Sequence, residues 1–257
     1  MALETRNLQG QIGSRRLIHG LDLAIAAGEC VAVVGPNGAG KTTLFRLLSG
    51  ELQPHAGQVL LNRRELRHWS LNQLARMRAV LPQSSTLQFA FTVQEVVAMG
   101  RMPHDTGRLT DAAIVDEVMT LCDVKRLALR AYTELSGGER QRVQLARVLA
   151  QVWQPVPEGE RLLLLDEPTS ALDLAHQLEL MLVVKQVCQA DIAVLIIVHD
   201  LNLAARFADR ILMLHEGRAV ALGTPADVMR ADLIECVFNV KTRVIEHPVY
   251  GCPLVVS

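Results

Sequence analysis

The chain has 257 residues, enough to form one large domain or two modest ones and to bury a sizeable core. Half of its residues are hydrophobic and 21% are charged, so we expect a globular rather than a disordered protein. It carries 26 basic and 27 acidic residues, a net charge of −1, and no long basic tract. This balance argues against nucleic acid as the main partner.

The apolar runs of the sequence are short. The run Ile-Ala-Val-Leu-Ile-Ile-Val at 192–198 is far below the roughly 18–20 residues that span a bilayer, and it predicts a buried parallel strand. The N-terminus lacks the apolar stretch of a signal peptide. The five cysteines are odd in number and widely spaced, without a Cys-x-x-Cys pair, which favours a reducing cytoplasmic compartment.

The N-terminal part predicts strands and short helices. Residues 3–34 carry short strands, of which the last, 30–34, enters the core after a Gly-Glu turn. Residues 41–49 predict a helix that ends at Gly50. Residues 56–82 predict a strand, a polar turn and a short helix.

The middle of the chain has a helical pattern, with few strand signals. Helices are expected at 93–99, 114–121 and 140–151. Strand–helix alternation returns at Leu162 and continues to about residue 222. A polar, proline-bearing stretch, 154–160, predicts a surface insertion just before the returning strand.

This alternation predicts a single domain of the α/β class. Residues 1–83 and 151–257 are expected to form its α/β core, and residues 84–150 a helical insertion into that core.

Residues 35–42, Gly-Pro-Asn-Gly-Ala-Gly-Lys-Thr, fit the phosphate-loop pattern G-x-x-x-x-G-K-[ST] between an apolar strand and a helix. The glycines leave room for phosphate oxygens, and the helix N-terminus faces the anion. Lys41 is expected to reach the β- and γ-phosphates, Thr42 to ligate Mg²⁺ and Thr43 to contact the α-phosphate. The candidate nucleotide-binding residues are Gly35, Pro36, Asn37, Gly38, Ala39, Gly40, Lys41, Thr42 and Thr43.

Four leucines at 162–165 predict a buried parallel strand that ends at Asp166 and Glu167. Ligands bind at this edge of open α/β sheets. Asp166 is expected to hold Mg²⁺ through water, and Glu167 to orient and polarise an attacking water. A pair of solvated carboxylates at a strand end is the alternative, which the phosphate loop upstream weakens.

The segment Leu-Ser-Gly-Gly-Glu-Arg-Gln begins the last of the three expected helices. Ser136 is a good N-cap, and Glu139 three residues later completes a capping box, so helix capping alone could explain them. Gly137 and Gly138 are costly in a first turn, however, unless the backbone approaches something closely.

The phosphate loop, this segment and the leucine strand together resemble the ATP-binding-cassette (ABC) ATPases, over nearly the whole chain. The resemblance implies a P-loop NTPase core with an N-terminal antiparallel β subdomain and an inserted α-helical subdomain that carries the Leu-Ser-Gly-Gly-Glu signature. It also implies ATP and Mg²⁺ as cofactors and a homodimer with two sites across its interface. The signature of one subunit, Ser136, Gly137, Gly138 and Glu139, closes there on the γ-phosphate held by the other subunit's loop.

Further roles come only from the resemblance. Gln83 matches the Q-loop glutamine, which meets Mg²⁺ and water, and His199 matches the switch histidine, which contacts the γ-phosphate. Residues 170–173, Ser-Ala-Leu-Asp, match the D-loop at the dimer interface. The expected catalytic residues are Glu167, His199 and Gln83, and the expected Mg²⁺ ligands are Thr42, Gln83 and Asp166.

The sequence departs from the family's pattern at adenine. ABC ATPases often stack an aromatic residue about 25 positions before the phosphate loop on the base. Residues 8–16 contain no aromatic, and Gly10 stands at the expected position. Stacking by Arg15 or Arg16 is a hypothesis.

Three segments, 91–104, 172–177 and 199–204, are similar to the ATPases of iron-siderophore, heme and vitamin B12 importers. Within that subgroup, residues 145–155 and the extra loop before Leu162 resemble heme (hemin) importer ATPases. Because the ATPase does not touch the cargo, a ferric siderophore or vitamin B12 stays an alternative to hemin.

The resemblance also predicts partners. A long coiled coil, as in chromosome-structuring ABC ATPases, and a second cassette, as in translation-associated ones, are both missing from the sequence. We therefore expect a homodimer on the cytoplasmic face of a bacterial inner membrane, bound to two heme permease subunits through residues 84–105, and indirectly to a periplasmic heme-binding protein. A permease-free soluble ABC ATPase and a nucleotide-binding module without turnover are the alternatives.

Overall fold

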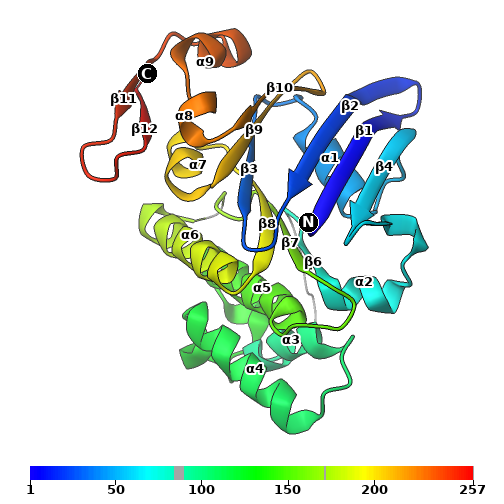
Figure 1. Ribbon diagram of the computed structural model, residues 1–257. Coiled ribbons are helices and arrows are strands. Elements are labelled where there is room, and N and C mark those ends of the chain that lie inside the picture. Colours follow the sequence, from blue (N-terminus) through cyan, green and yellow to red (C-terminus); the bar gives the residue numbers. More distant parts are fainter. Residues whose placement is uncertain (84–89, 171, 257) are drawn as a thin grey trace.

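Two large sheets form the framework of the chain in a computed structural model, which describes residues 1–83, 90–170 and 172–256 (Figure 1). A six-stranded sheet has the order β10-β9-β3-β8-β7-β6, a four-stranded sheet the order β2-β1-β4-β5, and β11 and β12 form a hairpin. The strands are β1 (Leu3–Ile12), β2 (Arg15–Ile25), β3 (Cys30–Val34), β4 (Ala56–Leu61), β5 (Arg64–Glu65), β6 (Arg78–Leu81), β7 (Arg161–Asp166), β8 (Ile192–Ile197), β9 (Arg210–His215), β10 (Arg218–Gly223), β11 (Arg243–Glu246) and β12 (Pro253–Val256).

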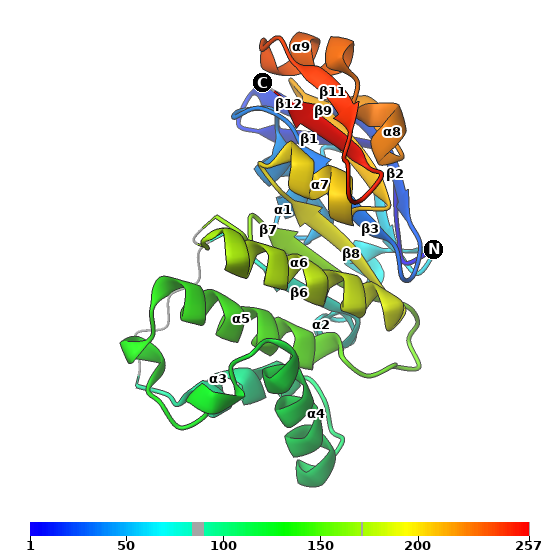
Figure 2. The same cartoon turned by 90° about the vertical axis from the view of Figure 1, so that its left-hand side faces the viewer.

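Helices cover the six-stranded sheet and extend below it in the views of Figures 1 and 2. The α-helices are α1 (Lys41–Leu48), α2 (Leu71–Met77), α3 (Val93–Ala98), α4 (Arg108–Leu121), α5 (Gly137–Val152), α6 (Leu174–Gln189), α7 (Leu201–Phe207), α8 (Pro225–Val228) and α9 (Ala231–Phe238). Short 3-10 turns are η1 (Leu66–His68), η2 (Met99–Arg101), η3 (Lys125–Leu127) and η4 (Tyr132–Glu134). Within the described residues, no helix is long and apolar enough to cross a membrane.

The six-stranded sheet buries both of its faces, and the leucine strand shows how. Leu163 and Leu165 of β7 join a core with α5 and α6, whereas Leu162 and Leu164 join a second core with α1 and the four-stranded sheet. Successive side chains of a strand point to opposite faces, so a strand covered on both sides is apolar throughout. This explains the uninterrupted leucine run.

Because β6, β7 and β8 are parallel, their C-terminal ends lie at the same edge of the sheet. β7 pairs in parallel with both β6 and β8, and β3 pairs in parallel with β8 and β9. The residues that follow β6, β7 and β8 therefore leave the sheet side by side. This edge carries the carboxylates and the amide predicted from the sequence.

Several elements differ from their predicted bounds. β1 and β2 are ten and eleven residues long, because bulges let their ladder continue where short strands were expected. α4 begins six residues before Ile114, because its first turns are largely solvent-exposed and show no apolar period. α5 begins at Gly137, so the glycine pair lies inside its first turn.

Two regions were missed altogether. β6 follows α2 without a loop, so its four residues were read as part of a helical segment. Beyond residue 223 the chain forms α8, α9 and the β11–β12 hairpin, where no elements were expected. The hairpin is fastened to α7, because Asn202 exchanges two hydrogen bonds with the backbone of Val255.

The stretch 154–160 is more firmly attached than a simple surface insertion. Asn62 exchanges two hydrogen bonds of 3.0 Å with the backbone of Glu160. Glu158 forms an ion pair with Arg76 of α2. Val156 packs against the core beneath the four-stranded sheet. Contacts with residues about 80 to 100 positions away in the chain hold this loop.

Candidate functional site

The phosphate loop joins β3 to α1 and depends on its glycines. Gly35, Gly38 and Gly40 have φ values of 155°, 80° and 103°, which side chains disfavour. A Cβ at residue 35 would lie 2.2 Å from the carbonyl oxygen of Leu214, and one at residue 40 would lie 2.8 Å from that of Leu17. The loop therefore packs closely at both ends, while its middle is open.

Lys41 lies within this loop rather than in solvent. Its Nζ donates to the carbonyl oxygens of Gly35, at 2.7 Å, and Pro36, at 3.1 Å. Burial lowers the pKa of Lys41, and the nearby Glu167 and Asp166 oppose that effect. The hydroxyl-bearing Thr42 next to it is exposed, and Thr43 is buried. The loop thus carries an ammonium group whose only described acceptors are its own carbonyls.

Three strand ends bring the predicted catalytic residues together. Gln83 follows β6, Glu167 follows β7 and His199 follows β8. Gln83 Nε2 donates to Glu167 Oε2 at 2.7 Å, and His199 Nε2 lies 2.6 Å from Glu167 Oε1. Both oxygens of the Glu167 carboxylate are therefore held by the two residues that the sequence assigned to the same site.

The backbone at Glu167 is in the left-handed region, with φ of 49°. Its N–H donates to the carbonyl oxygen of Ile197, and its own carbonyl oxygen accepts from the N–H and hydroxyl of Ser170. A non-glycine residue in this region is uncommon and is held there by its surroundings. These bonds fix where the carboxylate points.

Asp166 is a buried carboxylate, 5% exposed, and no described residue donates a hydrogen bond to it. Burial, and then the negative charge of Glu167, raises the pKa of Asp166 to about 6, although Lys41 acts in the opposite direction. The Asp166 carboxylate therefore has no direct cationic partner among the described residues.

A divalent cation would provide a positive partner for the Asp166 carboxylate. Asp166, the exposed Thr42 hydroxyl and the side-chain oxygen of Gln83 are the oxygen donors that Mg²⁺ prefers. No group of three or more His, Cys, Asp or Glu side chains among the described residues could hold a metal alone. Mg²⁺ typically needs only one or two carboxylates when phosphate oxygens and water complete its shell.

The signature segment is not joined to the phosphate loop by any interaction between described residues. Ser136 caps α5: Glu139 N–H donates to its hydroxyl at 3.3 Å, and its own N–H donates to the Glu139 carboxylate at 2.9 Å. These bonds also hold the pKa of Glu139 below its usual range. A Cβ at Gly137 would meet nothing within 4 Å, whereas one at Gly138 would meet the Leu172 side chain at 3.3 Å. Gly137 thus faces open space.

The D-loop stretch is only partly described. Ala171 lies outside the described residues. Leu172 is buried, and the Asp173 carboxylate caps α6 by accepting the N–H of His176 at 3.0 Å. Within one chain, this stretch therefore joins the signature segment to the start of α6.

The adenine region shows why Gly10 is a glycine. A Cβ there would lie 2.6 Å from the Leu47 side chain of α1, so a larger residue at position 10 would require that side chain to move. Ile12, at the end of the same strand, is 44% exposed. Arg15 and Arg16, on the neighbouring strand, are exposed, and their side chains form no hydrogen bond or ion pair with a described residue.

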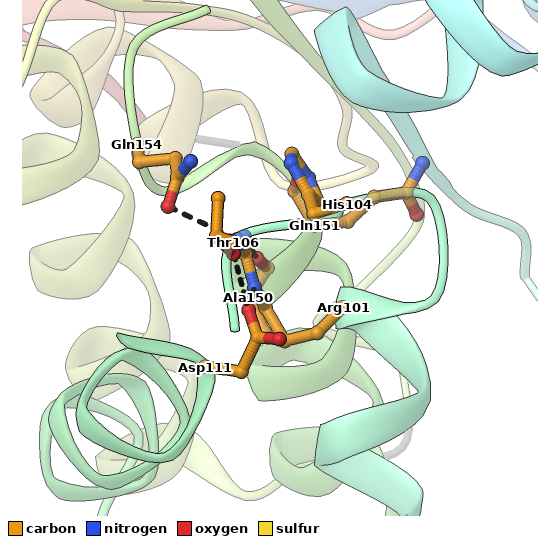
Figure 3. Close-up of polar contacts among 7 residues, drawn as sticks. All are labelled: Arg101, His104, Thr106, Asp111, Ala150, Gln151 and Gln154. Atoms are coloured by element: carbon orange, nitrogen blue, oxygen red, sulfur yellow. Dashed lines mark hydrogen bonds and ion pairs between the residues drawn. The ribbon is translucent and has the colours of Figure 1, made fainter. Parts of the chain in front are cut away.

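A cluster around Arg101 was missed by sequence analysis as a structural unit (Figure 3). Arg101 is 4% exposed. Its guanidinium donates to the Asp111 carboxylate at 2.8 Å, the Ala150 carbonyl oxygen at 2.7 Å, and Thr106 Oγ1 and Gln154 Oε1 at 3.0 Å each. This cluster joins η2 and α4 to the last turn of α5.

Two neighbours extend the cluster. His104 Nε2 lies 2.7 Å from the Gln151 carbonyl oxygen, and Gln151 Nε2 donates to the carbonyl oxygens of Ala75 and Arg78. A Cβ at Gly100 would lie 2.2 Å from the Arg147 carbonyl oxygen, so this glycine permits the close approach of η2 to α5. The Gly-Arg pair at 100–101, in a segment already noted for its resemblance, was the available signal.

The fold, the phosphate loop and the carboxylate edge define an ATPase of the ABC class. The chain belongs to the ABC transporter family, whose family model matches residues 18–170.

Individual relatives are similar over nearly their whole length. A protein of Pseudomonas fluorescens named "Hemin import ATP-binding protein HmuV" is 51% identical over 255 residues, 99% of each chain. A protein of the same name from Pseudomonas aeruginosa is 49% identical with the same coverage, and one from Myxococcus xanthus is 47% identical, covering 100% of this chain and 97% of that one.

Solved structures agree in fold. A metal-chelate type ABC transporter in an inward-facing conformation is 27% identical, with a TM-score of 0.80 over 99% of this chain and 96% of the other. A dimeric ATP-binding cassette bound to ADP and Pi is 24% identical, with a TM-score of 0.74 over 86% of this chain and 98% of the other. The second comparison bears on the fold alone.

Proposed function

We propose that this chain is the ATP-hydrolysing subunit of a hemin importer and that Glu167 activates the attacking water. The observation that carries the hydrolytic role is the carboxylate of Glu167 held between Gln83 and His199, at 2.7 Å and 2.6 Å, beside the phosphate loop. A carboxylate fixed at both oxygens is oriented for a water that binds against it. Strand ends, rather than mobile loops, set that orientation.

The other site residues have complementary roles. Residues 35–43 surround the phosphates, and the Lys41 ammonium exchanges its carbonyl acceptors for phosphate oxygens. Mg²⁺, when bound by Thr42, Asp166 and Gln83, supplies charge that offsets the developing negative charge of phosphoryl transfer. Its positive charge would also lower the pKa of Asp166, which in the free chain is raised to about 6.

We also propose a homodimer in which the signature segment of one subunit completes the other's site. Gly137 supports this, because no described residue outside its own helix turn lies within 4 Å of a Cβ placed there. Glycine is therefore unexplained by packing within one subunit, whereas close approach of a phosphate from outside would require it. Arg15, Arg16 or the exposed Ile12 then borders the base.

Cargo and partners follow from the relatives rather than from the geometry. Near-complete alignment with proteins named for hemin import supports hemin as the cargo, with two permease subunits at the inner membrane's cytoplasmic face and a periplasmic heme-binding protein. A permease would dock on 90–105 and the residues just before it, since Arg101 fastens this segment to α5.

The test is reconstitution. The chain is co-expressed with the hemin permease of a relative, placed in liposomes, and assayed for ATP hydrolysis with and without the heme-loaded binding protein. We expect stimulation by heme that Glu167→Gln abolishes. Stimulation by a ferric siderophore or a corrinoid instead would keep the ATPase role and reject hemin. An ATPase active alone, without a stable permease complex, would favour a permease-free ABC ATPase.

A further inference from the structure

A cavity away from the nucleotide site is lined by residues of the C-terminal end of α1, of β4 and of α2. Figure 1 shows where these elements lie. The volume of the cavity is about 360 Å³. Polar and apolar groups share its lining, and the apolar side chains include Leu47, Leu52, Leu66, Trp69 and Leu74. None of its described lining residues belongs to the phosphate loop, the carboxylate edge or the signature segment.

One charged side chain in this cavity has no partner. Arg78, the first residue of β6, lines the cavity, and its Nε and Nη1 are buried without a hydrogen bond to any described residue. Its Nη1 lies near Gly50: a Cβ placed on that glycine would be 3.2 Å from Arg78 Nη1. Burial lowers the pKa of Arg78, and no nearby negative charge opposes this effect.

The carboxylate among the described lining residues, Glu65, already has partners. Glu65 also lines the cavity, but it forms an ion pair with Arg67 and accepts a hydrogen bond from Gln58 at 2.6 Å. With Glu65, Arg67 and Arg78 as its charged lining residues, the cavity carries a net charge of +1. The positive charge without a described partner is that of the half-buried Arg78.

Arg101 shows what a satisfied buried arginine looks like in the same chain. Its guanidinium donates to four oxygens, one of them on a carboxylate. Burying an ionised group without such partners costs several kcal/mol. An arginine cannot shed its proton to avoid that cost, so an anion that enters the cavity would find two unpaired donors, Nε and Nη1, on the half-buried Arg78.

We propose that this cavity binds a small amphipathic carboxylate, whose anion pairs with Arg78 and whose apolar body lies against Trp69 and the leucines. A volume of about 360 Å³ lies within the range of roughly 300–1,000 Å³ that small-molecule sites occupy, and such sites combine apolar walls with a few polar groups. A guanidinium binds a carboxylate through two parallel hydrogen bonds.

The lining also excludes one amphipathic carboxylate. Among the described residues that line the cavity there is no His, Cys, Met or Tyr, the side chains that hold heme iron. The site is therefore distinct from a heme pocket, and the proposal does not depend on the cargo or on ATP hydrolysis.

Trp69 provides the measurement. It is one of two tryptophans, and its Nε1 is fixed by a hydrogen bond to the Leu61 carbonyl oxygen at 3.1 Å. In a Trp153→Phe chain, Trp69 is the sole tryptophan. We would titrate this protein with octanoate below its micellar concentration, with octanamide as the neutral analogue, and follow the fluorescence of Trp69.

We expect a saturable change with octanoate and at least tenfold weaker binding of octanamide. Arg78→Gln should weaken octanoate binding at least tenfold, while Arg67→Gln, which removes an exposed charge at the same cavity, should change it less than twofold. Circular dichroism checks that each variant is folded. Arg78→Lys keeps the positive charge but lacks the two parallel N–H donors of a guanidinium, so it should bind octanoate with intermediate affinity.

Equal binding of the amide and the acid would overturn the proposal, because the cavity would then be selecting an apolar body alone. So would unchanged octanoate affinity in folded Arg78→Gln, or no saturable change at all in the parent protein. If octanoate fails but a short apolar peptide with a central glutamate binds, the counterion of Arg78 belongs to a protein partner and the small-ligand assignment is wrong.

Discussion

The carboxylate edge and the signature segment differ in how complete they are within one chain. At the edge, Gln83 and His199 each contact one oxygen of the Glu167 carboxylate within the same chain. In the signature segment, the side chains of Ser136 and Glu139 form described hydrogen bonds only within their capping box, and Gly137 faces open space. The residues of the carboxylate edge are thus joined within one chain, whereas the described signature segment is folded without a contact to the phosphate loop. This contrast is what a composite site between two subunits requires.

The largest effect is expected from Glu167→Gln at the carboxylate edge. Glutamine keeps the size and shape of the side chain but removes the carboxylate proposed as the general base. ATP hydrolysis should fall about 10²- to 10³-fold, because a positioned general base contributes about that much. Phosphate release measures it. Glu160→Gln, a change to an exposed carboxylate in the 154–160 loop, is the matched control and should hydrolyse ATP at the parent rate. Wild-type turnover in Glu167→Gln would show that the grip on this carboxylate is only structural.

Arg101→Gln tests whether the signature helix is anchored at its far end. This change removes an ion pair to Asp111 and hydrogen bonds to α5, so the free energy of unfolding should fall by about 3 kcal/mol. Urea denaturation measures it, with Arg126→Gln, at an exposed arginine 3.8 Å from Asp123, as the control expected to lose well under 1 kcal/mol. Equal losses in the two variants would mean that the cluster does not anchor α5.

Gly137→Ala separates the two explanations of the signature segment. Its φ is not positive and a Cβ there touches nothing, so alanine should raise the stability of the chain by about 0.5–1 kcal/mol. If a second subunit's phosphate approaches this point, ATP hydrolysis should nevertheless fall about tenfold. Parallel measurements of urea unfolding and phosphate release decide the matter. A more stable protein with unchanged activity would leave the segment as a helix cap and nothing more.

The carboxylate edge is also the part of the site whose placement follows from local sequence signals. The apolar strands before Asp166 and His199 are visible in the sequence, and parallel pairing carries their ends to one edge, so local motifs sufficed. The Arg101 cluster could not be found this way, because its acceptors come from α4, the loop before it, the end of α5 and the residue Gln154. No local period or turn signal connects such positions.

The same limit explains the misplaced elements. β6 has four residues and no turn before it, so only its pairing with β7 identifies it as a strand. The exposed first turns of α4 carry no apolar period, because nothing packs on them. Sequence patterns report burial on a regular face, and they are silent where an element is short or solvated.

The smallest effect concerns the raised pKa of the buried Asp166 carboxylate. Its folded pKa of about 6 exceeds the value of an unfolded aspartate, near 4, so between these values the folded chain binds the extra proton. The contribution of Asp166 to stability should therefore be most favourable below about pH 4 and decline as the pH rises to about 6. After screening at the sheet edge, about 1 kcal/mol should remain. Urea unfolding with EDTA, compared between the parent and Asp166→Asn, isolates this change. Saturating MgATP should remove it, since bound Mg²⁺ favours the ionised carboxylate, and a decline that persists unchanged with MgATP would place the cation elsewhere.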